Sequence, residues 1–199
     1  MKSLKESIEQ RRSIYAISNQ SPISDTELEG LVQFAAKHVP SAFNSQSTRL
    51  VLLLGDNHKK LWNIAKDALR KIVPEEAFAA TEQKIDSCFA AGYGTVLYFE
   101  DQTVVESLQK AFPLYANNFP VWSQHTSAMH QFAVWNLLEE AGLGATLQHY
   151  NPLIDDEVHK TWDLPASWTL IAEMPFGTPV AGAGEKAFYP IEDRVKIFK

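Results

Sequence analysis

The stretch NFPVWSQHTSAMHQFAVWNLLEEAGLGATLQHY, residues 118 to 150, indicates the fold more strongly than any other part of the chain. Its first part, Asn118 to Glu140, is the longest helical pattern in the sequence. The apolar residues of this part are spread widely around the helix, which is typical of a central, buried helix. They are Met129, Phe132, Ala133, Trp135, Leu137 and Leu138. Gly142 is a natural helix stop, so we expect one central helix followed directly by a glycine-containing and then polar segment.

The patterns on either side of this helix predict an α+β fold. Further helices are expected at about residues 4–11, 24–39, 56–72, 74–89 and 103–110, and strands at residues 50–54, 95–99, 168–174 and 195–198. Ser24 and Glu27 have the spacing of a capping box, and Asp56 is expected to cap the helix that follows it. The sequence contains no repeat or interdomain linker, so residues 1–199 are expected to form a single domain.

Composition narrows the class of protein. The 199 residues are 45% apolar and 21% charged, as in ordinary soluble domains. The net charge of -6 argues against a nucleic-acid partner or an anionic membrane surface. The single cysteine, Cys88, excludes an internal disulfide and a cysteine-based zinc site. No signal-peptide pattern or long apolar run is seen, so we expect a cytoplasmic protein without a membrane or nucleic-acid partner.

Arg11-Arg12-Ser13 is the first candidate binding motif. The chain has neither a Gly-x-Gly-x-x-Gly loop after a strand nor a Walker A loop, so side chains would have to hold any bound phosphate. Guanidinium groups offer a planar fork of donors that matches phosphate oxygens. From these residues alone, a solvated basic helix end is the more common explanation.

Two further stretches combine polar and small residues. Ser41 to Ser47 places several hydroxyl and amide groups before a strand that should be buried, although such residues also form ordinary turns. Gly144 and Ala145 would allow a flat ring to approach the backbone closely. His149 lies shortly after them, either as a proton donor or, more commonly, as a hydrogen-bonded polar side chain.

Taken together, these motifs resemble the nitroreductase family of flavin mononucleotide (FMN) enzymes. The family's Arg-(Arg/His)-Ser corresponds to residues 11–13, and its Pro-Ser-Ser-x-Asn-x-Gln-Pro-Trp corresponds to residues 40–48. Its Asn-Glu-x-Lys corresponds to residues 81–84, and the similarity extends through Gly142 to the C-terminal end. Residues 189–195 are similar to a subgroup of fungal and lactic-acid-bacterial nitroreductase-like stress proteins. The chain departs from the family pattern at Tyr15, Ser47-Thr48 and Phe188.

The resemblance implies a mixed β-sheet flanked by helices, with a C-terminal strand exchanged across an intimate homodimer that shares its FMN sites. The implied cofactor-binding residues are Arg11, Arg12, Ser13, Tyr15, Ser41, Ala42, Asn44, Gln46, Lys84, Leu147, Gln148, His149, Tyr150, Lys186 and Arg194. Residues 11–13 would grip the phosphate and ribityl, with Lys186 and Arg194 completing the clamp. Lys84 would lie near the pyrimidine edge, where a cation stabilises reduced flavin. Residues 41–46 would come from the partner, and residues 147–150 would face the ring.

The activity implied by the resemblance is an NAD(P)H-dependent oxidoreductase that reduces nitroaromatic or quinoid acceptors by a ping-pong hydride mechanism and has a role in oxidative stress. No side chain would act as a catalytic nucleophile, and no metal site is expected because His125 and His130 lie five residues apart. Four aromatic residues would either line a substrate mouth or pack in the core or an interface, namely Phe112, Tyr115, Phe119 and Trp122. The alternatives are a non-enzymatic flavin-binding stress or regulatory protein and a packed helical module without cofactor.

Overall fold

The computed structural model describes residues 2–199 and shows an α+β fold, as the sequence predicts. The helices are α1 (Leu4–Gln10), α2 (Asp25–His38), α3 (Gly55–Arg70), α4 (Glu75–Ile85), α5 (Gln102–Ala111), α6 (Phe119–Glu140), α7 (Asp155–Trp162) and α8 (Ile191–Arg194). Two short 3-10 turns, η1 (Ala42–Asn44) and η3 (Pro113–Tyr115), and one π-helical turn, η2 (Asp86–Ala90), complete the helical elements. The strands are β1 (Ile17–Ser18), β2 (Thr48–Leu54), β3 (Gly94–Asp101), β4 (Gly144–Ala145) and β5 (Trp168–Pro179).

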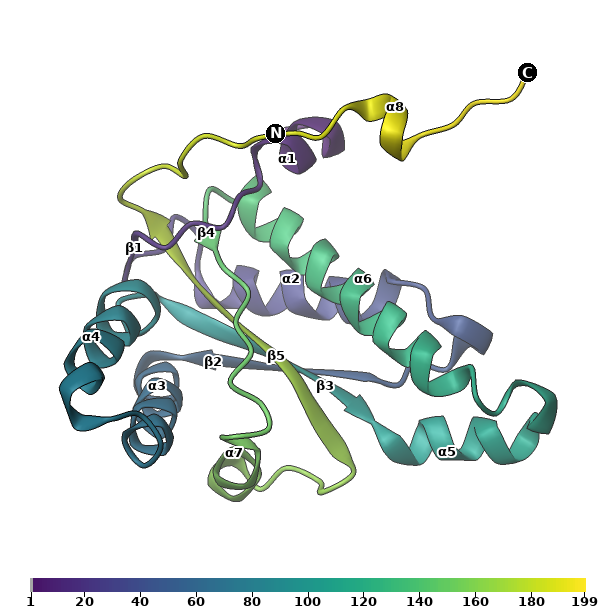
Figure 1. Cartoon of the computed structure of the whole chain (residues 1–199), viewed down its shortest axis with the longest axis horizontal. Coiled ribbons are helices and arrows are strands. Elements are labelled where there is room, and N and C mark those ends of the chain that lie inside the picture. Colours follow the sequence, from purple (N-terminus) through teal and green to yellow (C-terminus); the bar gives the residue numbers. More distant parts are fainter. Residues whose placement is uncertain (1) are drawn as a thin grey trace.

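The strands form one sheet in the order β1-β5-β3-β2, with the short β4 also paired to β5. Every pairing between these strands is antiparallel, and a parallel register appears in an isolated bridge between Ser13 and Ala145. β3 is buried along its whole length because it lies between β2 and β5 and helices cover both of its faces (Figure 1). β5 is therefore the strand through which β1, β3 and β4 are connected.

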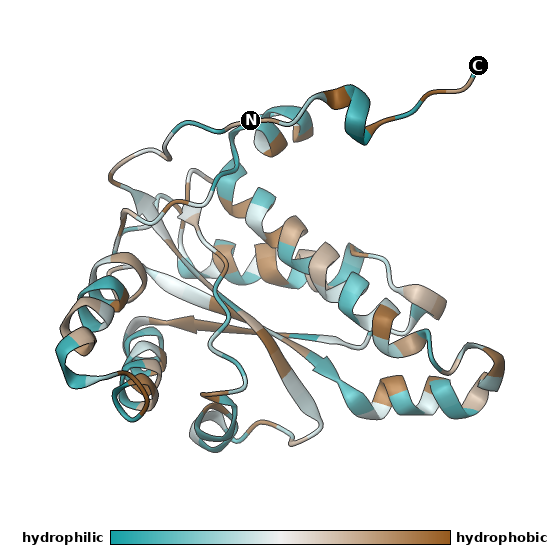
Figure 2. Cartoon of the chain, viewed as in Figure 1, coloured by the Kyte–Doolittle hydropathy of each residue, from teal (hydrophilic) through white to brown (hydrophobic). Residues whose placement is uncertain are grey.

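The core has two parts, one on each face of the sheet. On one face α2 and α6 pack against β3 and β5, with Val96, Tyr98 and Met174 fully buried between them. On the other face α3, η2 and α7 pack around Trp62, Phe89 and other buried residues (Figure 1). Figure 2 shows hydrophobic residues concentrated along β2 and the middle of β5. Burying each large apolar side chain contributes roughly 1.5 to 3 kcal/mol, so the sheet and its two helical layers stabilise one another.

Helix boundaries follow the sequence closely, with one correction. Ser24 caps α2 in the expected capping box with Glu27. Asp56, by contrast, does not cap α3, because Leu54 occupies the N-cap position and no side chain bonds there. Asp56 lies in the first turn instead, where a negative charge is favourable to the helix dipole.

α6 is only partly the buried helix that its apolar residues predict. Val134 and Leu138 are buried against the sheet, whereas the side chains of Met129 and Phe132 are 40% and 45% exposed. Phe132 lines an apolar groove between α1, α2 and α6. The apolar residues of α6 therefore cover two surfaces, and in a single chain one of these surfaces remains open.

The predicted strand at residues 195–198 is not formed within the chain. This segment follows α8 in an extended conformation but pairs with no strand, and Phe198 is 94% exposed. Figure 1 shows the tail running past α1 and away from the sheet. A strand needs a neighbour for its backbone hydrogen bonds, and none lies beside the tail, so its exchange across a dimer stays a prediction. Within residues 2–199, none of the helices combines the length and apolar character needed to cross a bilayer.

Candidate functional site

The motif at residues 11–13 lines a hollow of about 540 Å³ at the end of α1. The residues around it are Arg11, Arg12, Ser13, Tyr15, Ala16, Gly182, Ala183, Gly184, Glu185 and Lys186. The motif is held in place from behind, because the N–H of Ile14 donates to the carbonyl of Ala145 at 3.0 Å. The fold therefore brings the N-terminal motif to the same hollow as Lys186, although Ser13 and Lys186 lie 173 positions apart along the chain.

Arg11 and Arg12 give this hollow its electrostatic character. The guanidinium carbon of Arg11 lies 4.4 Å from the centroid of the Trp135 ring, and its Nε is buried without a hydrogen-bond partner. Burial, and then the charge of Arg12, lower the pKa of Arg11, while Glu139 opposes this shift. Arg12 Nη2 donates to the carbonyl of Gly184 at 2.8 Å. Arg11, Arg12 and Lys186 all line the hollow, and two guanidinium groups with an ammonium group are a donor set that fits a phosphate.

Residues 147–150 form a strap that is attached to β5. The backbones of Gln148 and Glu173 exchange two hydrogen bonds, of 2.7 and 3.0 Å. His149 Nδ1 lies 3.0 Å from the carbonyl of Ile171, which can only accept, so Nδ1 carries the proton. This arrangement agrees with the hydrogen-bonded interpretation of His149. Leu147 is half-buried against the core between α2 and α6.

Glu173 is a buried carboxyl beneath the strap that the sequence analysis did not single out. Its Oε2 accepts from the N–H of Tyr150 at 2.9 Å, while its Oε1 has no hydrogen-bond partner. Burial raises the pKa of Glu173 to about 8. Burial, and then the charge of Glu173, raise the pKa of Tyr150 to about 12. The sequence feature that indicates this buried carboxyl is a single acidic residue within the apolar run of β5.

The π turn η2 brings aromatic residues beside the strap. Phe89 lies 4.9 Å from Trp62 and 6.3 Å from both Tyr15 and Tyr150, measured between ring centroids. These four rings form an apolar wall that joins the N-terminal segment to the strap. The side chain of Lys84, in the last turn of α4, is exposed and does not line the hollow. Its contact with a cofactor stays a prediction.

His58 fixes the π turn to the sheet. The side chain is buried, its Nε2 lies 3.2 Å from the carbonyl of Ala90, and its Nδ1 lies 2.8 Å from Thr95 Oγ1. The carbonyl can only accept, so Nε2 carries the proton and Nδ1 accepts from the hydroxyl. Trp62 Nε1 donates to the same hydroxyl at 3.1 Å. Burial lowers the pKa of His58 to about 4, so the ring is neutral near pH 7.

The polar loop 41–46 lies away from this site in the same chain. Phe43 packs against Phe119 at the start of α6, whereas Arg11 packs against Trp135 near the end of that helix. Phe119 and Trp135 are 16 positions apart in the helix, which corresponds to about 24 Å. Figure 1 likewise places the turn before β2 at the opposite end of α6 from α1. One chain therefore does not unite the loop, namely Ser41, Ala42, Asn44 and Gln46, with the arginines.

Arg194 lies in α8 and is not among the residues that line the hollow, so its contact with a cofactor stays a prediction. Gly144 is small for the sake of packing, because a Cβ there would come within 2.9 Å of the Ile14 side chain. The Ile14 side chain therefore occupies the space beside Gly144 that the sequence analysis assigned to a flat ring. In the described part of the chain, residues 2–199, no group of three or more His, Cys, Asp or Glu side chains is placed to hold a metal ion.

The chain is similar along nearly its whole length to known nitroreductases. The model described as "Nitroreductase family" matches residues 8–178. Nitroreductase CinD from Lactococcus lactis, solved in complex with chloramphenicol, has 44% sequence identity and a TM-score of 0.90, covering 99% of this chain and 100% of that chain. A second structure of CinD, in complex with 4-nitrophenol, has 45% identity and a TM-score of 0.89, with the same coverage.

A curated relative agrees with these structures. The Saccharomyces cerevisiae protein HBN1 is 38% identical over 190 residues, which is 94% of this chain and 93% of HBN1. The match to the family model, residues 8–178, includes the N-terminal arginine motif, the strap and nearly the whole sheet, and the first CinD structure covers 99% of the chain. The chain therefore belongs to the nitroreductase family.

Proposed function

We propose that the protein is an FMN-dependent oxidoreductase that takes electrons from NADH or NADPH and reduces small nitroaromatic or quinoid acceptors. The observation that carries the proposal is the hollow that Arg11, Arg12, Ser13 and Lys186 line together. The CinD structures with chloramphenicol and 4-nitrophenol support an acceptor of this chemical class.

The chain's own residues would bind and orient the cofactor. Arg11 and Arg12 would hold the phosphate through charge-assisted hydrogen bonds, with Ser13 and Lys186 as additional donors. The strap 147–150 would provide one wall of the ring site, and its hydrogen bonds to β5 keep it rigid. Bound FMN would supply the hydride chemistry that none of these side chains provides.

The two substrates would use the site in turn, in ping-pong order. The aromatic wall of Tyr15, Phe89 and Tyr150 would exclude water on one side of the site. We place the loop 41–46 in the site of a second copy, because the separation along α6 keeps it from the arginines of its own chain. A homodimer with shared sites, acting in the cytoplasm under oxidative stress, completes the proposal.

The visible spectrum of the purified protein, with and without added FMN, tests the proposal most directly. We expect a flavin spectrum and consumption of NADH or NADPH that depends on an added nitroaromatic. A colourless protein that does not quench FMN fluorescence on titration would overturn it. FMN binding without steady-state NAD(P)H consumption would instead favour the non-enzymatic flavin-binding alternative.

A further inference from the structure

The loop before β2 has an unusual backbone. Phe43, Asn44 and Gln46 have φ angles of 57°, 51° and 49°, in the left-handed region. Asparagine tolerates this region, but for Phe43 and Gln46 the conformation is strained because Cβ approaches the backbone oxygen. None of the residues from 41 to 46 is a glycine. The surrounding structure must therefore hold the loop in this conformation.

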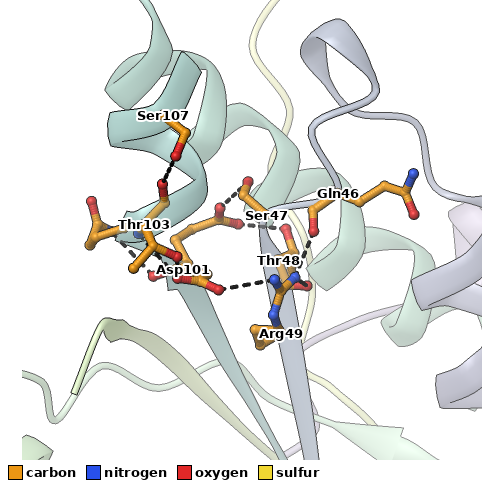
Figure 3. A network of polar contacts seen from close by, with 9 residues as sticks. Gln46, Ser47, Thr48, Arg49, Asp101, Thr103 and Ser107 are labelled. Carbon is orange, nitrogen blue, oxygen red and sulfur yellow. Dashed lines mark hydrogen bonds and ion pairs between the residues drawn. The ribbon is translucent and has the colours of Figure 1, made fainter. Parts of the chain in front are cut away.

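A network of polar side chains lies directly behind the loop, at the ends of β2 and β3 (Figure 3). We call Ser47, Thr48, Arg49, Glu100 and Asp101 the Glu100 clamp. Ser47 Oγ donates to Glu100 Oε2 at 2.6 Å, and Thr48 Oγ1 donates to the other oxygen, Oε1. Glu100 and Ser47 are buried, at 0% and 1% exposure. Burial raises the pKa of Glu100, and the two hydroxyls oppose that rise.

Arg49 connects the clamp to the loop. Its Nη1 donates to the carbonyl of Gln46 at 2.6 Å, and its Nη2 forms an ion pair with Asp101 Oδ2 at 3.0 Å. The other oxygen of Asp101 caps α5 by accepting from the N–H of Thr103 at 3.1 Å. Arg49 therefore links the carbonyl of Gln46, a residue in the left-handed conformation, to Asp101. Asp101 is in turn bonded to the start of α5.

The loop is also closed on itself and covered by aromatic rings. The N–H of Gln46 donates to Ser41 Oγ at 2.9 Å, and the N–H of Asn44 donates to the Ser41 carbonyl at 3.0 Å. Phe43 packs against Phe112 at 4.9 Å and lies parallel to Trp122 at 5.9 Å. The clamp fixes one end of the loop and the rings cover its middle.

We propose that Glu100 and Arg49 are positioning residues, which hold the loop 41–46 in one conformation before any ligand binds. The hydroxyls that bind Glu100 come from Ser47 and Thr48, where this chain departs from the family's Pro-Trp. Proline and tryptophan have no hydroxyl group and could not make these two hydrogen bonds. If the proposed function is right, the clamp preorganises Ser41, Asn44 and Gln46 to contact the flavin that a second copy binds.

Amide hydrogen exchange of the protein without FMN tests the clamp itself. The reporters are the amides of Asn44, Ser45 and Gln46, each of which donates a hydrogen bond within the loop. Arg49→Met removes the donors that hold the Gln46 carbonyl, and we expect these amides to exchange about tenfold faster or more. Glu100→Ala should have the same effect. Glu100→Gln should exchange at nearly the wild-type rate, because one hydroxyl can still donate to the amide oxygen while the other accepts from the amide N–H.

Arg70→Met is the matched control, because it breaks an ion pair of similar length, 2.9 Å, between Arg70 and Glu82 far along the chain. The control should leave the three reporter amides unchanged. Unchanged exchange in Arg49→Met, or equal changes in Arg49→Met and Arg70→Met, would overturn the proposal. If Glu100→Ala does not fold, Arg49→Met alone decides the result.

Flavin titration then tests whether the preorganised loop contributes to flavin binding. Since the loop would act at the ring and not at the phosphate, Arg49→Met should weaken FMN and riboflavin equally, by about tenfold. A faster-exchanging loop with unchanged affinity for both flavins would overturn the positioning role. A wild-type protein that binds no FMN would overturn the proposed function and the flavin part of this inference, and the exchange result would still decide whether the clamp holds the loop.

Discussion

At the scale of single residues, two buried titratable groups lie on the same face of the sheet, and burial shifts their pKa values in opposite directions. Burial lowers the pKa of His58 to about 4 and raises the pKa of Glu173 to about 8. Both groups are therefore neutral in the folded protein near pH 7. Each costs stability at the pH values where the unfolded chain would ionise it.

Glu173→Gln is expected to change how stability depends on pH. Between pH 4.5 and about 8 the folded wild type keeps a proton on Glu173 that the unfolded chain releases, so stability falls as pH rises. The variant has no such group, and its free energy of unfolding should stay flatter between pH 6.5 and 8. Urea unfolding of the flavin-free protein at several pH values measures this difference. Parallel pH profiles for the two proteins would contradict a buried neutral Glu173.

His58 should show the opposite sign. As pH falls from 6.5 to about 4, His58 takes up a proton in the unfolded chain but stays neutral in the folded protein. The free energy of unfolding should therefore fall by about 3 kcal/mol over this range. NMR titration of the imidazole resonances reports the site directly. We expect the His58 ring to remain neutral at pH 5, and a midpoint at or above pH 6 would show that the ring is not held as described.

Arg11→Ala tests the phosphate contact. Losing a charge-assisted hydrogen bond costs roughly 1.5 to 3 kcal/mol, so FMN affinity should fall about tenfold or more. Riboflavin, which lacks the phosphate, should be affected much less, and fluorescence titration of both ligands measures the contrast. Equal losses for the two ligands would assign Arg11 to the fold, through its contact with Trp135.

Part of the site follows from the sequence and part does not. Residues 11–13 and Lys186 were predicted together because their chemistry and order resemble a known pattern. Phe89 and Glu173 were missed, since the π turn has no local sequence signal and the environment of Glu173 depends on contacts between distant segments. The burial that shifts a pKa is a tertiary property, which periodicity does not encode.

At the scale of elements, strands and helices with strong local patterns were predicted well, and those that depend on partners were not. β2, β3 and α6 match their apolar runs to within a few residues. β4 has only two residues and exists because Gly144 and Ala145 pair with β5. The tail 195–198 has the alternation of a strand but pairs with no strand among residues 2–199. Pairing between segments distant in sequence is the part that local pattern cannot supply.

Gly177→Ala should disturb the contact between β1 and β5. A Cβ on Gly177 would lie 2.1 Å from the carbonyl oxygen of Ser18, so the two strands must separate. We expect a loss of about 2 kcal/mol or more in the free energy of unfolding, measured by urea denaturation. Gly182→Ala is the control, because nothing lies within 4 Å of a Cβ there. Similar stability for the two variants would show that β1 adapts without cost.

At the scale of the whole molecule, the open apolar surfaces agree with an assembly of two copies. The groove between α1, α2 and α6 encloses about 510 Å³ and is lined partly by exposed Phe34 and Phe132. The tail carries further exposed apolar side chains, including Ile197 and Phe198. Exposed apolar patches of this kind are typical of interaction sites.

Deleting residues 193–199 should therefore loosen a homodimer and release FMN together. The reason is that the tail would pair with the second copy and that each flavin site would use the loop 41–46 of that copy. Sedimentation at several concentrations, with flavin absorbance recorded in the same run, measures both effects. A monomer with full flavin occupancy would contradict the shared site even if FMN binding itself were confirmed.

The central position of β5 also has a consequence for how the protein is made. β1, β3 and β4 all pair with β5, yet β5 (residues 168–179) follows the other four described strands in the chain and leaves the ribosome after them. Until then β3 has one unpaired edge, and α2 and α6 lack Ala172, Met174 and Phe176 to pack against. The growing chain thus carries apolar surface on both sides of an unfinished sheet until β5 has been made. Premature termination before residue 168 would leave a product without its central strand and not a smaller working domain.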